Sequence, residues 1–175
     1  MSQLLSFATL IELSRKEDRI GGVSLSYGIE RLNPDKTRDY LYEWQAFFID
    51  ARDGFLYADD EDKERASAKL VELCRLRGFD IPTIQVEQVI FNNQQTESLI
   101  SQLQDITPGL SDALNTLSLG YSPLFEEWDE EWGAGVSAGS HWQSWTIAEV
   151  KGSSLYDVCY KLLIQLQDYK PDEKL

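Results

Sequence analysis

Residues 135–139, Gly-Val-Ser-Ala-Gly, have the G-x-S-x-G spacing of a hydrolase nucleophile elbow. That elbow needs a strand before it, a helix after it and a distant histidine as the base. Here an acidic, tryptophan-rich segment precedes the pattern, and His141, the only histidine, follows Ser137 by four residues. The pattern therefore predicts a glycine-rich loop and not a catalytic serine.

Two further patterns could bind a ligand, but neither has the surroundings that the ligand needs. Residues 133–135, Gly-Ala-Gly, echo a dinucleotide fingerprint, but five carboxylates directly upstream would repel a pyrophosphate. Asp59, Asp60 and Asp62 offer oxygens to a divalent cation, but carboxylates at the start of a helix more often stabilise the helix dipole. A lone His141 cannot build a histidine-rich metal site. We therefore expect no metal and no cofactor.

The cysteines and the carboxylates supply no catalytic assignment either. Cys74 and Cys159 lie on predicted helix faces without metal-ligand spacing, which is typical of buried free thiols in a reducing compartment such as the cytoplasm. Any two of the 30 acids could converge as a catalytic pair, and their spacing selects none. We therefore name no catalytic residue.

Residues 126–132 combine the densest acidic run of the chain with two tryptophans. In a local helix Trp128 and Trp132 would share one face, and carboxylates would cover the rest. Two interpretations stay open: core tryptophans beside a solvated acidic surface, or aromatic anchors inside an acidic rim that binds a partner. The second interpretation gives the candidate partner-binding residues Glu126, Glu127, Trp128, Asp129, Glu130, Glu131, Trp132, His141 and Trp142.

The net charge of −14 is concentrated in one part of the chain. Residues 78–150 contain 11 acids and no lysine or arginine, whereas residues 1–77 have a net charge of −3 and residues 151–175 a net charge of zero. Such a span attracts basic partners and repels phosphates and anionic membranes, although solubility of an acidic protein would explain it equally well. We expect a basic protein partner, no direct nucleic-acid binding and no membrane contact. No apolar run approaches about 20 residues, so no membrane span is expected.

These observations favour an acidic interaction protein: an inhibitor, an immunity-type protein or a nucleic-acid mimic that occupies a basic site on another protein. The main alternative is an enzyme in which His141, Trp142 and Trp145 line a small-molecule pocket. A third possibility is a subunit of a larger assembly, whose tryptophans are buried against a neighbour.

Hydrophobic periodicity predicts the elements that must position these residues. Alternation of apolar and polar residues is clearest from Val23 to Ile29, and residues 40–50 are rich in strand formers, with aromatics on both faces. Strands are predicted at residues 22–32, 40–50, 55–57, 82–91 and 145–147. Apolar stripes, caps and proline positions predict helices at residues 3–19, 60–77, 96–103, 108–120 and 154–166.

The predicted order is α-β-β-β-α-β-α-α-loop-β-α, without a visible internal repeat. Hairpin strands with helices between them indicate an α+β fold: one domain with a mainly antiparallel sheet of about four to five strands and about five helices. The length of 175 residues suits one domain over residues 1–168. Residues 169–175 are expected to be a polar tail.

Overall fold

One antiparallel sheet contains every strand of the described chain, in the order β3-β2-β1-β4-β5-β6. The structure is a computed structural model that describes residues 4–17, 20–50, 54–84, 94–122, 132–140 and 143–170. The strands are β1 (Ile20–Leu32), β2 (Arg38–Asp50), β3 (Gly54–Asp60), β4 (Asn115–Tyr121), β5 (Trp132–Ser140) and β6 (Gln143–Gly152). The helices are α1 (Leu5–Lys16), α2 (Lys63–Leu76), α3 (Gln94–Ile106) and α4 (Leu155–Gln167), with a short 3-10 helix, η2 (Thr107–Gly109). The predicted α+β fold is confirmed, with six strands and four α-helices in these residues.

One face of the sheet is apolar and buried. Along β1, Val23 and Leu25 are buried, while Ser24 and Ser26 are partly exposed. The same alternation runs through β4 and most of β5. Because side chains alternate between the two faces of a sheet, the buried positions of neighbouring strands form one continuous surface.

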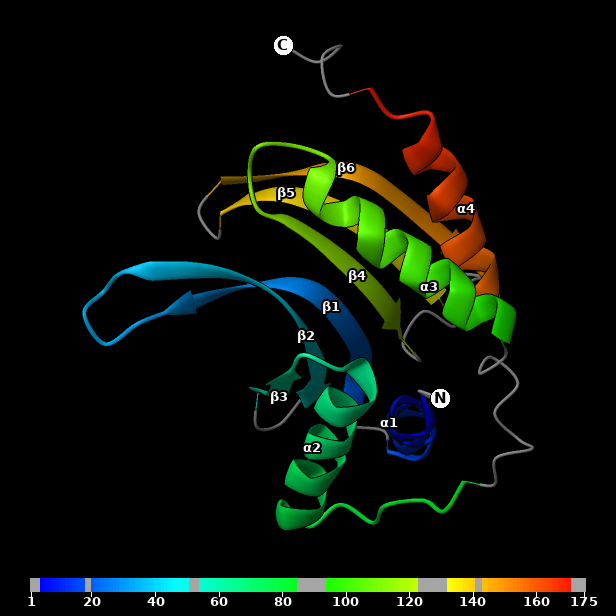
Figure 1. Ribbon diagram of the computed structural model, residues 1–175. Coiled ribbons are helices and arrows are strands. Elements are labelled where there is room, and N and C mark those ends of the chain that lie inside the picture. The colour runs from blue at the N-terminus through cyan, green and yellow to red at the C-terminus, as the bar shows by residue number, and fades with distance from the viewer. Residues whose placement is uncertain are drawn as a thin grey trace.

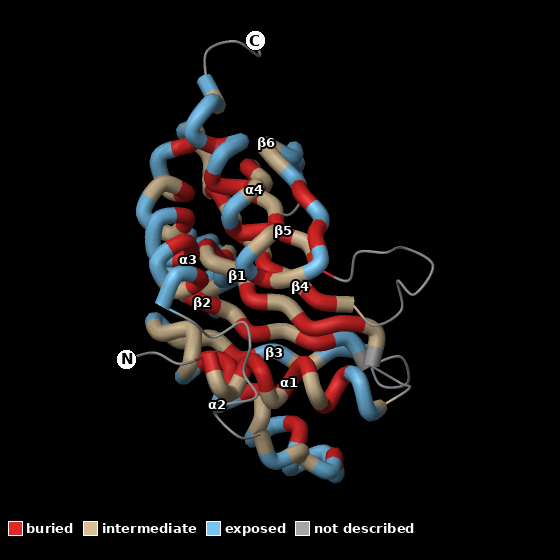
Figure 2. Tube along the Cα trace, turned by 90° about the vertical axis from the view of Figure 1, so that its right-hand side faces the viewer, coloured by how far each residue is buried: buried red, intermediate tan, exposed pale blue. Residues whose placement is uncertain are grey.

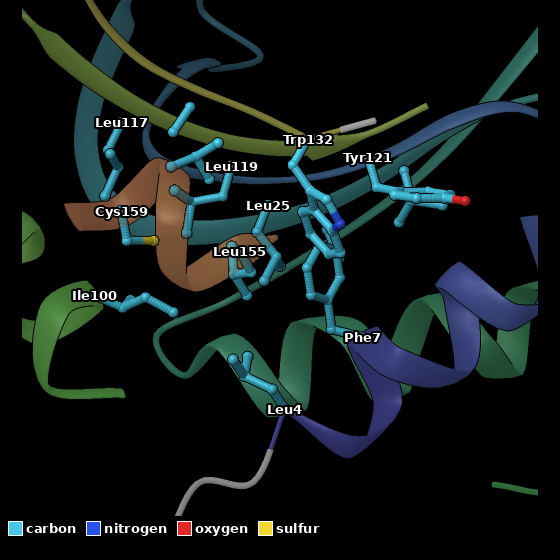
Figure 3. Close-up of a cluster of buried hydrophobic side chains, with 14 of the residues drawn as sticks. Leu4, Phe7, Leu25, Ile100, Leu117, Leu119, Tyr121, Trp132, Leu155 and Cys159 are labelled. Carbon is cyan, nitrogen blue, oxygen red and sulfur yellow. The ribbon is translucent and has the colours of Figure 1, made fainter. Parts of the chain in front are cut away.

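All four α-helices lie on this apolar side of the sheet (Figures 1 and 2). α1 and α2 pack together against the β1–β3 part, α4 packs on β5 and β6, and α3 packs on α4. Figure 3 shows Phe7 of α1, Ile100 of α3 and Cys159 of α4 around Leu25 and Leu119 of the sheet. The helices and this face therefore enclose a single core, and no described helix covers the opposite face.

The sheet consists of two similar halves, a repeat that the sequence analysis missed. Each half contains a helix, three strands that follow one another in a meander, and a second helix: α1-β1-β2-β3-α2 and α3-β4-β5-β6-α4. The halves join where β1 pairs antiparallel with β4, with Leu25 opposite Leu119. The strands of each half then extend outward from this central pair.

Matching side chains support the repeat. Tyr27 of β1 pairs with Trp44 of β2, and Tyr121 of β4 pairs with Trp132 of β5, with ring centroids 5.1 Å and 5.2 Å apart. The shared sequence is short, since residues 24–27 read SLSY and residues 118–121 read SLGY. Four similar residues at this separation do not stand out without knowledge of the strand pairing.

Two predictions for the second half are wrong. Residues 108–120 were expected to form a helix, but only Thr107–Gly109 is helical there, and Asn115–Tyr121 form β4. The expected glycine-rich loop at residues 135–139 is part of β5. Glycine and serine have weak strand preference, so pairing with β1 and with each other decides the structure of these segments. Of the strand predicted at residues 82–91, residues 82–84 are not in a strand, and the others lie outside the described residues.

The helix predicted at residues 60–77 is α2, which begins at Lys63. The carboxylate of Asp62, its N-cap, accepts a hydrogen bond from the backbone N–H of Arg65 at 2.9 Å. The apolar spacing of this helix predicts that Ala66, Leu70, Leu73 and Cys74 face the sheet. Ala66, Leu70 and Cys74 are buried, but Leu73 is 37% exposed. The buried stripe packs on β2 and β3, in the same sheet as β1.

Leu70 and Leu73 therefore make a matched pair for testing the packing of α2. Leu70→Ala should lower the free energy of unfolding by about 2–5 kcal/mol, because Leu70 is fully buried and its loss leaves a cavity. Leu73→Ala should cost about 1 kcal/mol or less, since surface substitutions have small effects. Urea unfolding measures both. Equal losses for the two variants would contradict this packing of the helix.

Candidate functional site

Of the nine predicted partner-binding residues, the structure describes Trp132. The other eight, Glu126 to Glu131, His141 and Trp142, lie outside the described residues. Trp132 is 5% exposed and packs edge-on to Phe7, at 6.5 Å between ring centroids, and beside Tyr121 (Figure 3). The core interpretation therefore holds for Trp132, and its role as an exposed anchor is corrected. As the first residue of β5, paired with Tyr121, it points to the helix side of the sheet.

The face of the sheet opposite the helices is an open surface that no described helix covers. The middle parts of its three central strands, residues 24–26 of β1, 116–120 of β4 and 133–137 of β5, present only glycine, serine and threonine there. We call this strip the small-residue trough; its residues are Ser24, Ser26, Thr116, Ser118, Gly120, Gly133, Gly135 and Ser137. Shallow hollows of about 410 Å³, 600 Å³ and 350 Å³ lie along it. The hollows are open to solvent along the sheet, whereas small-molecule sites bury most of the surface of their ligand.

Large apolar side chains border the trough on the β2–β3 side. Phe47 and Ile49 of β2 lie beside Phe55 and Tyr57 of β3, and we call these four residues the aromatic patch. The ring centroids of Phe47 and Phe55 are 5.2 Å apart, and those of Phe55 and Tyr57 are 6.4 Å apart. Ile49 is 48% exposed, Phe55 61% and Tyr57 52%. A cluster of such side chains in contact with solvent is typical of an interaction site.

Residues 40–50 have aromatics on both faces, but the sequence alone does not identify the aromatic patch. The signal was present, because Phe47 and Ile49 alternate with the buried Ala46 and Phe48. What the sequence lacked was the knowledge that all the helices lie on one side. A strand with apolar residues on both faces would otherwise be explained as a fully covered strand.

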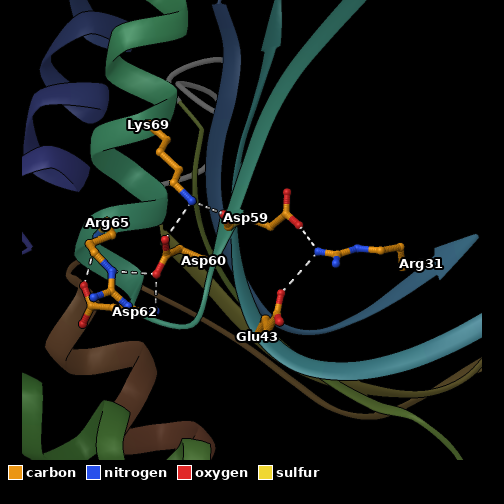
Figure 4. A network of polar contacts seen from close by, with 7 residues as sticks. All are labelled: Arg31, Glu43, Asp59, Asp60, Asp62, Arg65 and Lys69. Carbon is orange, nitrogen blue, oxygen red and sulfur yellow. Dashed lines mark hydrogen bonds and ion pairs between the residues drawn. The ribbon is translucent and has the colours of Figure 1, made fainter. Parts of the chain in front are cut away.

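A network of charged residues borders the aromatic patch where β3 runs into α2 (Figure 4). Arg31 of β1 pairs with Asp59 of β3 and, at 3.3 Å, with Glu43 of β2. Asp60 pairs with Arg65 and Lys69 of α2, each at 2.7 Å. The network therefore ties the end of β3 to the first two turns of α2.

Asp60 is the most perturbed carboxyl of this network. The hydrogen bond from Lys69, the backbone N–H of Asp62 and the hydrogen bond from Arg65 lower the pKa of Asp60 well below its usual range. Asp62 caps α2, and Asp60 pairs with Arg65 and Lys69 in its first two turns. These two acids therefore stabilise the start of the helix, the role that the sequence favoured over a cation site. The described chain holds no group of three or more His, Cys, Asp or Glu side chains that could bind a metal ion.

Neither cysteine is a candidate nucleophile. Cys74 and Cys159 are free and fully buried, as predicted. Burial raises the pKa of each thiol to about 12, so the thiolate that would react is scarce at neutral pH. Trp145, expected in the alternative enzyme pocket, is exposed on β6 and lines none of the three hollows.

No protein-family model matches this chain, and no curated protein matches its sequence. None of the described helices has the length and apolar character needed to cross a membrane.

The ion pairs of Asp60 predict a pH-dependent contribution to stability. The folded-state pKa lies below the unfolded value, so the contribution is complete above about pH 5 and is lost as pH falls toward the folded pKa. Asp60→Asn should therefore be less stable than wild type at pH 7, and the difference should narrow below about pH 4. Thermal unfolding across this pH range measures it.

Glu61→Gln is the control for this experiment, because Glu61 is an exposed neighbour in the same acidic stretch. It removes the same formal charge and should change stability little at either pH. A difference between wild type and Asp60→Asn that stays constant from neutral to acid pH would contradict the assigned role of the ion pairs.

Proposed function

We propose that this protein is a protein-interaction module, an inhibitor or immunity-type protein that occupies a basic site on another protein. The aromatic patch carries the proposal. Phe55, Tyr57 and Ile49 lie about half exposed on two adjacent strands, while the alternate residues of the same strands are buried or partly buried. Aromatic side chains are enriched among the residues that supply most of the energy of protein interfaces.

The charge of the chain supports a basic partner. A net charge of −14 attracts a positively charged surface over a Debye length and raises the rate of encounter. The same charge opposes contact with nucleic-acid phosphates, and a protein that fills a phosphate-binding site would act as a nucleic-acid mimic. The acids at residues 126–131 connect β4 to β5 and remain candidates for this electrostatic role.

Capture from an extract of the native host tests the proposal. Wild type should retain a stoichiometric basic protein at about 50 mM salt and lose most of it at about 200 mM. The purified partner should then bind wild type saturably. Phe55→Ser combined with Tyr57→Ser should weaken its binding about tenfold or more, because both exposed rings are lost.

Gly133→Leu and Leu73→Ala complete this variant set. A Cβ at Gly133 would approach no atom closer than 3.8 Å, so leucine projects into the small-residue trough without disturbing the sheet. It should also weaken binding if the partner lies across the uncovered face. Leu73→Ala, on the helix side, should not. A partner that is acidic, or one that binds all variants equally, would contradict the proposal.

The carboxylates of residues 126–131 should set the rate of association. Changing Glu126, Glu127, Glu130 and Glu131 to Gln should slow binding and flatten its salt dependence, because charge acts at long range before contact. Dissociation should change little. Stopped-flow kinetics with the purified partner at several salt concentrations measures both rates.

A second variant separates local from overall charge. Glu72→Gln, Asp105→Asn, Asp112→Asn and Asp168→Asn together remove the same number of charges from exposed positions on α2, on α3, in the loop before β4 and at the end of α4. This variant should retain most of the association rate. If both variants slow binding equally, only the net charge matters, and the role of residues 126–131 is wrong.

A further inference from the structure

The two edges of the sheet differ in how well they are protected against pairing with another strand. Unpaired edges invite additional strands, and charges, proline and bulges prevent this. On β6, the pairing register with β5 shifts between Val136 and Ser137, and Glu149 and Lys151 are exposed near the end that leads into α4. Residues 143–148 of β6 carry no charge, so the register shift is the protective feature that distinguishes this edge from the β3 edge.

The β3 edge has none of these features along residues 54–58. The segment Gly-Phe-Leu-Tyr-Ala contains no charge and no proline, and it pairs with β2 in continuous register from Gly54 to Asp60. Its exposed side chains are those of Phe55 and Tyr57 in the aromatic patch. An uncharged edge with exposed aromatics is unusual for a strand that remains unpaired.

The hydrogen bonds of α2 indicate which backbone groups of β3 face outward. Lys69 donates from Nζ to the carbonyl oxygen of Asp59 at 3.0 Å, so this carbonyl is accessible from outside the β2–β3 pair. In an antiparallel pair, successive residues direct their N–H and C=O groups to alternate sides. The N–H and C=O groups of Tyr57 and Phe55 therefore point outward as well.

The second half of the chain repeats this lysine contact. Lys161 of α4 donates to the carbonyl oxygen of Lys151 on β6, also at 3.0 Å. In each half, a lysine of the following helix thus binds a backbone carbonyl near the end of the edge strand. On β3, Lys69 binds the carbonyl oxygen of Asp59. The outward backbone groups of Phe55 and Tyr57 lie farther along the strand, beside the aromatic patch.

We propose that the β3 edge accepts an extended, basic segment of the partner polypeptide as a seventh strand. Main-chain hydrogen bonds to Phe55 and Tyr57 would hold the segment, and alternate side chains of the segment would pack on the aromatic patch. This inference rests on the proposed function and specifies the conformation and the chemistry of the part that binds.

The charges around the edge favour lysine and arginine in that segment. Five carboxylates lie at the α2 end of β3 and on the adjoining part of β2, namely Glu43, Asp59, Asp60, Glu61 and Asp62. Three cations pair with them, namely Arg31, Arg65 and Lys69. Glu61 is exposed, which leaves a carboxylate accessible to a basic side chain.

A second copy of this chain suits the edge less well. Pairing two β3 edges would bring together two chains of net charge −14. It would also place the acidic stretch Asp59–Asp62 of each copy at an end of the new strand pair. The second copy would bring the same excess of carboxylates over cations as the first, so the acidic excess would double. Like charges at a strand pair are destabilising.

A synthetic peptide of about ten residues that alternates lysine with valine is the probe. Fluorescence anisotropy should show saturable binding to wild type, and a matched peptide that alternates glutamate with valine should not bind. A lysine peptide with N-methylated amides on the pairing edge should bind about tenfold more weakly or worse, because its side chains are unchanged but its backbone donors are lost. Amide hydrogen exchange of Phe55 and Tyr57 should slow in the complex, while that of β6 should not.

Two substitutions of Tyr57 distinguish the contribution of the backbone N–H at the β3 edge from that of the aromatic ring. Tyr57→Ala and Tyr57→Pro both remove the ring, but only proline removes the outward N–H, and an edge position tolerates it. Tyr57→Pro should bind the peptide about tenfold more weakly than Tyr57→Ala. The N-methylated peptide tests the same hydrogen bonds on wild type, so the result does not depend on the folding of the proline variant.

The outcomes distinguish this inference from the proposed function. Failure of the lysine peptide to bind saturably, equal binding of the N-methylated peptide, or a dimer of the free protein in sedimentation equilibrium overturns the edge inference. If the host partner still binds through the aromatic patch, the proposed function survives that result. If the host extract yields no basic partner, the proposed function fails, even where the peptide binds at the edge.

Discussion

The antiparallel pairing of β1 with β4 is the contact on which the rest of the structure depends. It places Leu25 opposite Leu119 and joins two three-stranded meanders, each with two helices, into one sheet. A three-stranded sheet with two helices has a small core, whereas the joined sheet supports a single core beneath four helices. The Tyr–Trp pairs of both halves then lie on the same side of the sheet and pack into that core.

With all four helices on one side of the sheet, the described chain leaves the other side uncovered. Its central strip consists of glycine, serine and threonine, which tolerate contact with water without a cover. The aromatic patch does not share this property, since Phe55 and Tyr57 would lose unfavourable contact with water if a partner covered them. The difference between these two parts of one surface is the physical basis for assigning binding to the β2–β3 side.

Electrostatics and apolar contact have different roles in this proposal. The excess of acids acts at long range and favours a basic partner, whereas the aromatic patch and the β3 edge act only after contact. The charged network around Asp60 also holds β3 against α2, so the edge strand is fixed in position before a partner arrives. A fixed edge reduces the conformational entropy that is lost on binding.

The sequence by itself determined the elements whose local signals are strong and the overall charge. Strict alternation marked β1. The acidic cluster Asp59–Asp62 marked the start of α2, and the capping box of Ser154 and Asp157 marked the start of α4, because these signals depend on neighbouring residues only. The net charge of −14 and the position of the basic-free span also follow directly from composition.

Only the tertiary structure decided β4, β5 and the location of the open surface. The glycines and serines of these strands have little strand preference of their own, and pairing across the sheet supplies the stability that the local sequence lacks. The same pairing placed the side chain of Trp132 on the core side of the sheet. Whether Phe55 and Tyr57 are covered depends on which side the helices take, and that choice is made by the packing of the whole chain.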